Sequence, residues 1–223
     1  MSKKLPETTT SYWRDSVEIP DFPTLEQDMQ VDICIVGGGI TGITAAYVLT
    51  KAGLKVVLLE ANQLFGGTTG HTTAKITAQH DLIYDELITN MGKNNARLYY
   101  EANMDALRLI EKTVEELQID CDFKKQDAYV YATTDQSEEK INKEAKAYEK
   151  LGIDGGLAEK LPIDLKIKNA VVMRNQAQFH PLKYLVHLVD DIKANGGQIF
   201  ANTTAVNVEK GDEPTVLTRN DHR

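Results

Sequence analysis

One stretch, residues 31–60, constrains the fold of this chain more than any other part. Its sequence is VDICIVGGGITGITAAYVLTKAGLKVVLLE. The apolar run 31–36 predicts a strand buried on both faces of a parallel sheet, and the run 56–59 predicts a second strand of that sheet. The segment 40–52 between them predicts a helix that Gly53 ends. This strand–helix–strand order indicates an α/β fold, with a parallel sheet and helices on both faces.

Three glycines follow the first strand, and an acidic residue follows the second. Gly37, Gly39 and Gly42 have the G-x-G-x-x-G spacing, and Glu60 comes 18 positions after Gly42. Gly37 permits the turn, Gly39 a close approach of a diphosphate, and Gly42 close packing of helix and sheet. The helix N-terminus favours phosphate groups, and Glu60 is placed to accept hydrogen bonds from a ribose. The backbone around these positions completes the predicted dinucleotide site: Gly38, Ile40, Thr41 and Ala61.

The alternative is an ordinary glycine turn in a βαβ unit that binds no nucleotide. Structural turns rarely need three glycines at this spacing together with an acid at the end of the next strand, so the pattern favours a dinucleotide. Glu60 argues against NADP because its carboxylate would repel a 2′-phosphate.

A loop rich in glycine and threonine follows, with the sequence ANQLFGGTTGHTTAKITAQH over residues 61–80. Its hydroxyl and N–H groups suit an extended cofactor, which favours FAD over NAD, whereas the alternative is a flexible surface loop. Lys75 offers a positive charge for the N1/C2=O edge of a flavin; His71 could do the same or simply hydrogen-bond within the loop. The predicted contacts in this loop are Gly67, Thr68, Thr69, His71, Thr72, Thr73 and Lys75.

The composition of the chain argues against several classes of binding partner. The net charge is −8 and the sequence pI is about 5.2, which gives no reason to expect nucleic acid as a partner. No apolar run approaches the roughly 20 residues needed for a membrane span. The two cysteines, Cys34 and Cys121, suggest thiols in a reducing compartment, so we expect a cytoplasmic protein. No Cys/His cluster has the spacing of a metal site, so none is predicted.

The rest of the chain predicts further elements and a division into domains. Residues 1–30 are expected to be an extended arm, anchored by the packing of Tyr12 and Trp13. Apolar spacing predicts a long helix within 82–117 whose buried stripe is Leu98, Ala102, Ala106, Ile110, Val114 and Leu117. Further predicted elements are antiparallel strands 120–124 and 128–133, helix 135–151, a strand at 171–172, a helix from Pro181 to Gly196, and strands 199–200, 203–208 and 215–218. We expect residues 31–80 and 169–223 to form the dinucleotide domain, and 81–168 to belong to an inserted α+β substrate domain.

Three segments, taken in order, carry a family resemblance. These are VGGGITGITAAYVLTKAGLKVVLLE, GGTTGHTTAKIT and FHPLKYLVHLVDDIKANGGQIFANTTAVNVE. They resemble the N-terminal half of FAD-dependent oxidoreductases of the D-amino acid oxidase/glycine oxidase superfamily, in particular a bacterial subgroup with a C-terminal Rieske iron–sulfur domain. The resemblance implies FAD bound by the residues named above, with Val206 at the adenine end through its backbone. It also implies an amine or amino-acid substrate.

The family continues beyond the last residue of this sequence, so we expect a truncated N-terminal portion whose FAD site is open on one side. Three interpretations remain open: an FAD-dependent oxidase of C–N bonds that uses O2 or an electron-transfer domain, a catalytically incomplete dinucleotide-binding fragment, and an NAD-dependent dehydrogenase. The sequence identifies no catalytic side chain, and it leaves open whether the flavin is covalently attached.

Overall fold

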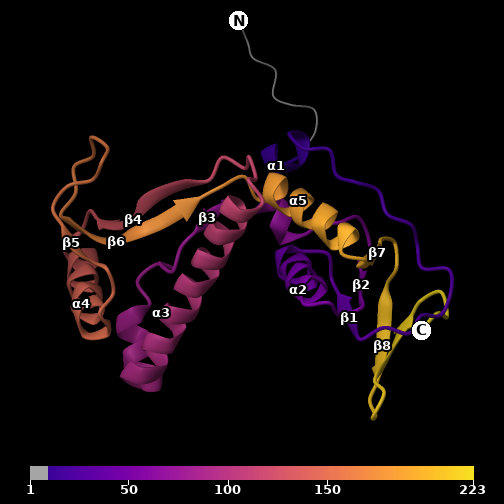
Figure 1. Ribbon diagram of the computed structural model, residues 1–223. Helices are drawn as coiled ribbons and strands as arrows, with labels where there is room; N and C mark the ends of the chain where they lie inside the picture. Colours follow the sequence, from indigo (N-terminus) through magenta and orange to yellow (C-terminus); the bar gives the residue numbers. More distant parts are fainter. Residues whose placement is uncertain (1–9) are drawn as a thin grey trace, which may run out of the picture. The chain divides into compact units, whose positions relative to one another are not determined.

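The computed structural model describes residues 10–223, which form two compact units (Figure 1). The first unit takes residues 10–73 and 180–223, and the second takes residues 74–179. The first contains α1 (Tyr12–Asp15), β1 (Ile33–Val36), α2 (Ile40–Lys51), β2 (Val56–Leu59), the 3-10 helix η1 (Thr68–His71), α5 (Pro181–Ala194), β7 (Gln198–Phe200), β8 (Ala205–Glu209) and β9 (Thr215–Thr218). The second contains β3 (Lys75–Ile76), α3 (Tyr84–Glu116), β4 (Lys124–Ala132), α4 (Asp135–Leu151), β5 (Gly155–Ala158) and β6 (Asn169–Gln178).

A three-stranded parallel sheet organises the first unit. Its strand order is β1-β2-β7, with Ile33 opposite Val56 and Leu58 opposite Ile199. All four residues of β2 are buried because this strand is central. β1 is only partly buried, since it is an outer strand of the described sheet, whereas the sequence predicted burial on both faces. The α/β class and the parallel sheet are confirmed.

The two long helices of this unit cover one face of the sheet. α2 and α5 pack against each other, α2 also contacts β1 and β2, and α5 contacts β7 (Figure 1). The strand order advances in one direction, so right-handed crossovers place both helices on the same side. Two side chains of β2 belong to a different cluster: Val57 and Leu59 pack with Leu25 of the arm. Met29 of the arm and Val216 of β9 also lie against this cluster. The expected second layer of helices is thus replaced, in the described residues, by the arm and β9.

The second unit is built on an antiparallel sheet in the order β3-β6-β4, with β5 also paired to β6. The prediction of separate strands 120–124 and 128–133 was wrong, because β4 runs continuously over Lys124–Ala132. A register irregularity between Gln126 and Ala128 accommodates the polar residues that suggested a turn. α4 covers β4 and β6 and ends at Gly152, whose φ of 68° is left-handed, as the sequence predicted.

The long helix α3 differs from its prediction in two ways. It is kinked at Gly92, where φ is 81° and ψ is 161°, so two helical segments meet there. The predicted apolar stripe was also wrong: Leu98, Ala102 and Ala106 are exposed. The buried residues of α3 are Tyr84, Ala96, Met104, Leu107 and Thr113. Apolar residues recur on two sides of this helix, so periodicity alone could not select the side that faces the core.

The boundaries between the units fall beside Ala74 and Phe179 instead of near residues 80 and 169. The reason is the pairing of β3 with β6, in which Lys75 lies opposite Gln178. Both strands therefore go with the second unit. Among residues 10–223, no helix is long and apolar enough to cross a membrane.

Candidate dinucleotide-binding site

The turn between β1 and α2 depends on glycine at two positions. Gly37 leaves β1 with a φ of 109°, a conformation that residues with a side chain rarely adopt. A Cβ on Gly42 would lie 1.9 Å from the carbonyl oxygen of Gly37, so only glycine lets the first turn of the helix pack this closely on the turn. Glycine is therefore required at position 37 by the backbone conformation and at position 42 by close packing.

Glu60 follows the buried strand β2 and turns toward this glycine turn. Its Oε2 accepts a hydrogen bond of 2.7 Å from Gly38 N, and its Oε1 accepts one of 2.9 Å from Asn62 N. The two bonds fix the carboxylate at the carboxyl edge of the sheet. A carboxylate has about four acceptor sites, so it can still accept from a ribose hydroxyl.

The N-terminus of α2 lies beside the threonine-rich loop. Gly39 is its N-cap residue and offers no side-chain cap, and the first turn contains no acidic residue. Thr69 of η1 accepts a hydrogen bond of 3.0 Å from Ile40 N, which brings the threonine-rich loop against this helix end. The positive end of the helix dipole and the first N–H groups therefore face the space between the turn and the loop.

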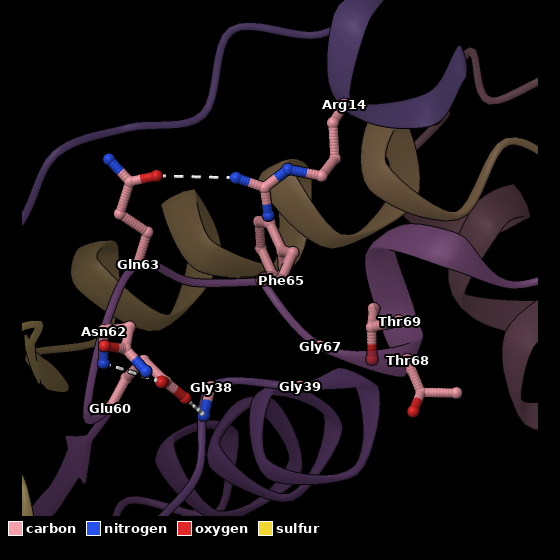
Figure 2. Close-up of a pocket in the computed structure, with 11 residues that line it drawn as sticks. Arg14, Gly38, Gly39, Glu60, Asn62, Gln63, Phe65, Gly67, Thr68 and Thr69 are labelled. Carbon is pink, nitrogen blue, oxygen red and sulfur yellow. Dashed lines mark hydrogen bonds between the residues drawn. The ribbon is translucent and has the colours of Figure 1, made fainter. Parts of the chain in front are cut away.

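A pocket with a volume of about 560 Å³ occupies this space, which is within the usual range for ligand pockets (Figure 2). Its lining comes from the arm, the glycine turn, the end of β2 and the loop. The eleven lining residues are Arg14, Gly38, Gly39, Glu60, Asn62, Gln63, Phe65, Gly66, Gly67, Thr68 and Thr69. Arg14 and Glu60 are the charged members of this set.

Comparison with known proteins identifies the family. The sequence matches the family described as "FAD dependent oxidoreductase" (DAO) over residues 32–223. The chain belongs to the DAO family of FAD-dependent oxidoreductases. FAD is the cofactor of this family, and the expectation of FAD over NAD is confirmed.

Individual relatives agree with this assignment. The chain is 53% identical over 221 residues to the "Putative Rieske 2Fe-2S iron-sulfur protein YhfW" of Bacillus subtilis, covering 99% of this chain and 43% of that protein. It is 25% identical to the "Gamma-glutamylputrescine oxidoreductase" of Escherichia coli, covering 95% of this chain and 51% of that protein. The fold resembles that of glycine oxidase from Geobacillus kaustophilus, with a TM-score of 0.65 at 15% identity, over 86% of this chain and 52% of that one. The chain thus spans about half the length of these relatives.

The residues of the DAO-family pocket fit FAD. The N-terminus of α2, whose first turn contains no acidic residue, and the hydroxyls of Thr68 and Thr69 suit a diphosphate, and the oriented carboxylate of Glu60 suits a ribose. At Gly67, an added Cβ would meet nothing within 4 Å, so the bare backbone leaves open space at the pocket wall.

The structure brings together part of the predicted contact set. Six of the predicted residues line the pocket: Gly38, Gly39, Glu60, Gly67, Thr68 and Thr69. Gly37, Ile40, Thr41, Gly42 and Ala61 adjoin it along the chain and shape its turns. His71 is exposed and its Nδ1 lies 3.0 Å from the carbonyl oxygen of Gly67.

Four other predicted residues do not line the pocket. The carbonyl oxygen of Thr72 accepts a 2.7 Å hydrogen bond from Trp13 Nε1, and Thr73 is exposed at the end of the first unit. Lys75 belongs to the second unit, so its contact with the cofactor stays a prediction. Val206 is 56% exposed in β8, which pairs with β9. Among residues 10–223, no group of three or more His, Cys, Asp or Glu side chains could hold a metal ion.

Sequence reasoning missed several lining residues, and Arg14 is the most informative of them. Asn62, Gln63 and Phe65 immediately follow Glu60, so adjacency could have suggested them. Arg14 lies 46 positions before Glu60 in a segment without periodicity, SYWRDS. Its place in the pocket depends on how the arm docks, which no local pattern reveals.

Proposed function

We propose that this chain provides the FAD-binding portion of an oxidoreductase that oxidises the C–N bond of an amine or amino acid. The observation that carries the proposal is the pocket at the end of β1 and β2 in a chain of the DAO family. When bound, FAD supplies a hydride acceptor at flavin N5, and the protein supplies binding, orientation and local charge.

The described residues have distinct tasks in this proposal. The helix N-terminus at Gly39 and the hydroxyls of Thr68 and Thr69 bind the diphosphate, because they offer N–H and O–H donors beside a positive dipole end. Glu60 orients the adenosine half by accepting from its ribose. We assign no general base, since no described side chain has a position that identifies it as one.

Relatives support the substrate class. The E. coli relative is named for oxidation of gamma-glutamylputrescine, and the structural neighbour from G. kaustophilus is named for glycine. Both names describe substrates that contain an amine. We therefore propose an amine or amino-acid substrate, with the second unit contributing part of the substrate domain.

The electron acceptor is proposed from the B. subtilis relative, which is named as a Rieske iron–sulfur protein and is more than twice as long as the matched region. An electron-transfer domain of this kind in the longer protein would take electrons from the reduced flavin, and dioxygen is the alternative acceptor. We also propose a cytoplasmic location, because Cys34 and Cys121 are free thiols.

A second candidate follows from the chain's coverage of about half of its relatives. In that case the chain binds FAD, but oxidation requires parts of the relatives that it does not match. The two candidates differ in one observable, which is flavin reduction by an amine.

The test is anaerobic mixing of the FAD-loaded protein with a panel of primary amines, secondary amines and amino acids. The proposal predicts that at least one of them bleaches the visible flavin absorbance, whereas hydroxy acids of matched size do not. A loaded protein that no amine bleaches would favour the second candidate. Bleaching by hydroxy acids alone would contradict the proposed substrate class.

A further inference from the structure

The N-terminal arm contributes a charged residue to the pocket, although no part of the glycine motif predicts it. Arg14 is the positively charged member of the eleven lining residues, and it comes from α1 (Figure 2). The other charged member, Glu60, accepts hydrogen bonds from the backbone N–H groups of Gly38 and Asn62 and forms no ion pair with Arg14 among the described residues. The guanidinium of Arg14 is therefore not neutralised by the carboxylate that shares its pocket.

The guanidinium of Arg14 is poorly satisfied by the protein. Its Nη1 is buried and has no hydrogen-bond partner among the described residues. Its Nη2 donates only a long hydrogen bond of 3.4 Å to Gln63 Oε1. Arg14 is half-buried as a residue, so the cost falls on Nη1, a buried donor of a charged group that has no acceptor. The Nη1 group of Arg14 therefore lacks an acceptor among the described residues.

The arm holds Arg14 in this position through several contacts. The hydroxyl of Ser11 donates to the carbonyl oxygen of Gly70, and Trp13 Nε1 donates to that of Thr72 over 2.7 Å. A Cβ on Gly70 would collide with the carbonyl oxygen of Phe65 at 2.3 Å, and the stem of Arg14 also lies against this glycine, with Cδ 3.1 Å from the Cβ position. The arm and the threonine-rich loop are therefore packed as one structure.

His180 fixes the end of the same arm. Its Nδ1 accepts a 3.2 Å hydrogen bond from Lys183 N as the N-cap of α5, so its Nε2 carries the proton and donates to Ser16 Oγ over 2.9 Å. The Trp13 ring packs edge-on against the His180 ring, with centroids 5.0 Å apart. The arm is thereby bound at both ends of α1.

We propose that Arg14 is a phosphate-binding residue that neutralises the diphosphate of the dinucleotide, and that arm residues 11–16 form a wall of the cofactor site. The inference rests on the proposed FAD site. A diphosphate lying between the N-terminus of α2 and the loop supplies the acceptors that Nη1 lacks. Guanidinium and phosphate match in geometry, and their hydrogen bonds are charge-assisted.

The experiment compares ADP and FAD binding to the wild-type chain and to Arg14→Gln, Arg14→Lys and the control Arg97→Gln. Arg97 is exposed on α3 in the second unit and pairs with Glu101. We expect Arg14→Gln to weaken ADP and FAD by about tenfold to a hundredfold, with a shallower dependence of log Kd on log salt. Arg14→Lys should recover part of the affinity because it keeps the charge, and Arg97→Gln should match the wild type.

The stability of the ligand-free protein distinguishes a ligand-binding role of Arg14 from a structural one. Because Nη1 has no protein partner, Arg14→Gln should keep or raise the melting temperature without ligand, with unchanged fluorescence of Trp13, the only tryptophan. Unchanged ADP affinity in Arg14→Gln, or a lowered melting temperature that accounts for the loss, would overturn the inference and leave the proposed function intact. A wild-type chain that binds ADP with this arginine dependence but refuses FAD would contradict the proposed function alone. Failure to bind either ligand would overturn both.

Discussion

At the residue scale, the glycines of the predicted site differ in why glycine is needed: some are required by packing within the protein, and others leave room for the ligand. Gly42 is enclosed, because its Cβ would collide with Gly37 O at 1.9 Å, whereas a Cβ on Gly67 would meet nothing within 4 Å. Both are glycines of the predicted site. Their substitutions should therefore fail in different ways.

Gly42→Ala should destabilise the first unit by about 1–3 kcal/mol, because the helix must move away from the turn. Urea unfolding followed by Trp13 fluorescence measures this loss. Gly211→Ala is the matched control, since its Cβ would meet nothing within 4 Å. Equal stability of the two variants would contradict the packing described for Gly42.

Gly67→Leu should lower the free energy of unfolding by only about 1 kcal/mol, because its side chain enters open space and the cost is limited to the backbone, whose φ of −89° and ψ of −143° suit glycine best. FAD affinity should fall by about tenfold or more, since that space is part of the pocket. Fluorescence titration of the ligand-free variant with FAD measures the change. A variant that binds FAD as tightly as the wild type would show that the cofactor does not approach this wall.

Local spacing predicted the glycine turn and Glu60 because those residues interact within one βαβ unit. Arg14 escaped prediction because docking of the arm through Trp13 and His180 is a tertiary event. Strand propensity located β8, and the backbone contact of Val206 with the adenine end of FAD stays a prediction.

At the element scale, α3 depends on a glycine that the sequence did not mark as special. At Gly92 the φ of 81° and ψ of 161° lie in a region that essentially only glycine occupies. The kink joins two segments whose buried residues lie on a side that periodicity did not select. The prediction of a helix was correct, but the kink and the side of the helix that faces the core could be identified only from the tertiary structure.

Gly92→Ala should destabilise the second unit by about 1–3 kcal/mol through backbone strain, since no atom lies within 4 Å of the added Cβ. Urea unfolding monitored by circular dichroism tests this. Asn95→Ala provides a comparison one turn away at an exposed position. If Gly92→Ala were as stable as the wild type, the helix would not be kinked as described.

A buried carboxylate links α4 to the start of α3. Glu144 is 1% exposed and accepts hydrogen bonds from Tyr84 N and Asp85 N, at 2.9 and 3.0 Å. Burial raises the pKa of this carboxyl above its usual value of 4.5, although the backbone donors act in the opposite direction. The folded state therefore binds this proton more tightly than the unfolded state, and stability falls as the pH rises from 4.5 through the folded pKa.

Glu144→Gln should remove this component, so its free energy of unfolding should decrease less than that of the wild type as the pH rises above the usual glutamate pKa. Urea unfolding at a series of pH values measures the difference. Glu149→Gln, on the exposed side of the same helix, should follow the wild-type pH dependence. Parallel pH profiles for Glu144→Gln and the wild type would contradict the argument.

At the scale of the whole molecule, the chain divides into a unit that carries the pocket and a second unit whose sequence, residues 74–179, separates the two segments of the first. The order of predicted elements was enough to anticipate an insertion. The boundaries were not, because the pairing of β3 with β6 assigns both strands to the second unit. Pairing between strands about 100 residues apart in sequence has no local signal.

The central claim, that this chain forms an FAD site, is tested most directly by the visible absorption spectrum of the purified protein, before and after addition of FAD and removal of excess. The account predicts a flavin spectrum near one FAD per chain. Acid precipitation then shows whether the flavin is covalently attached, according to whether it stays in the pellet or is released. A colourless protein that also retains no added FAD would contradict the account.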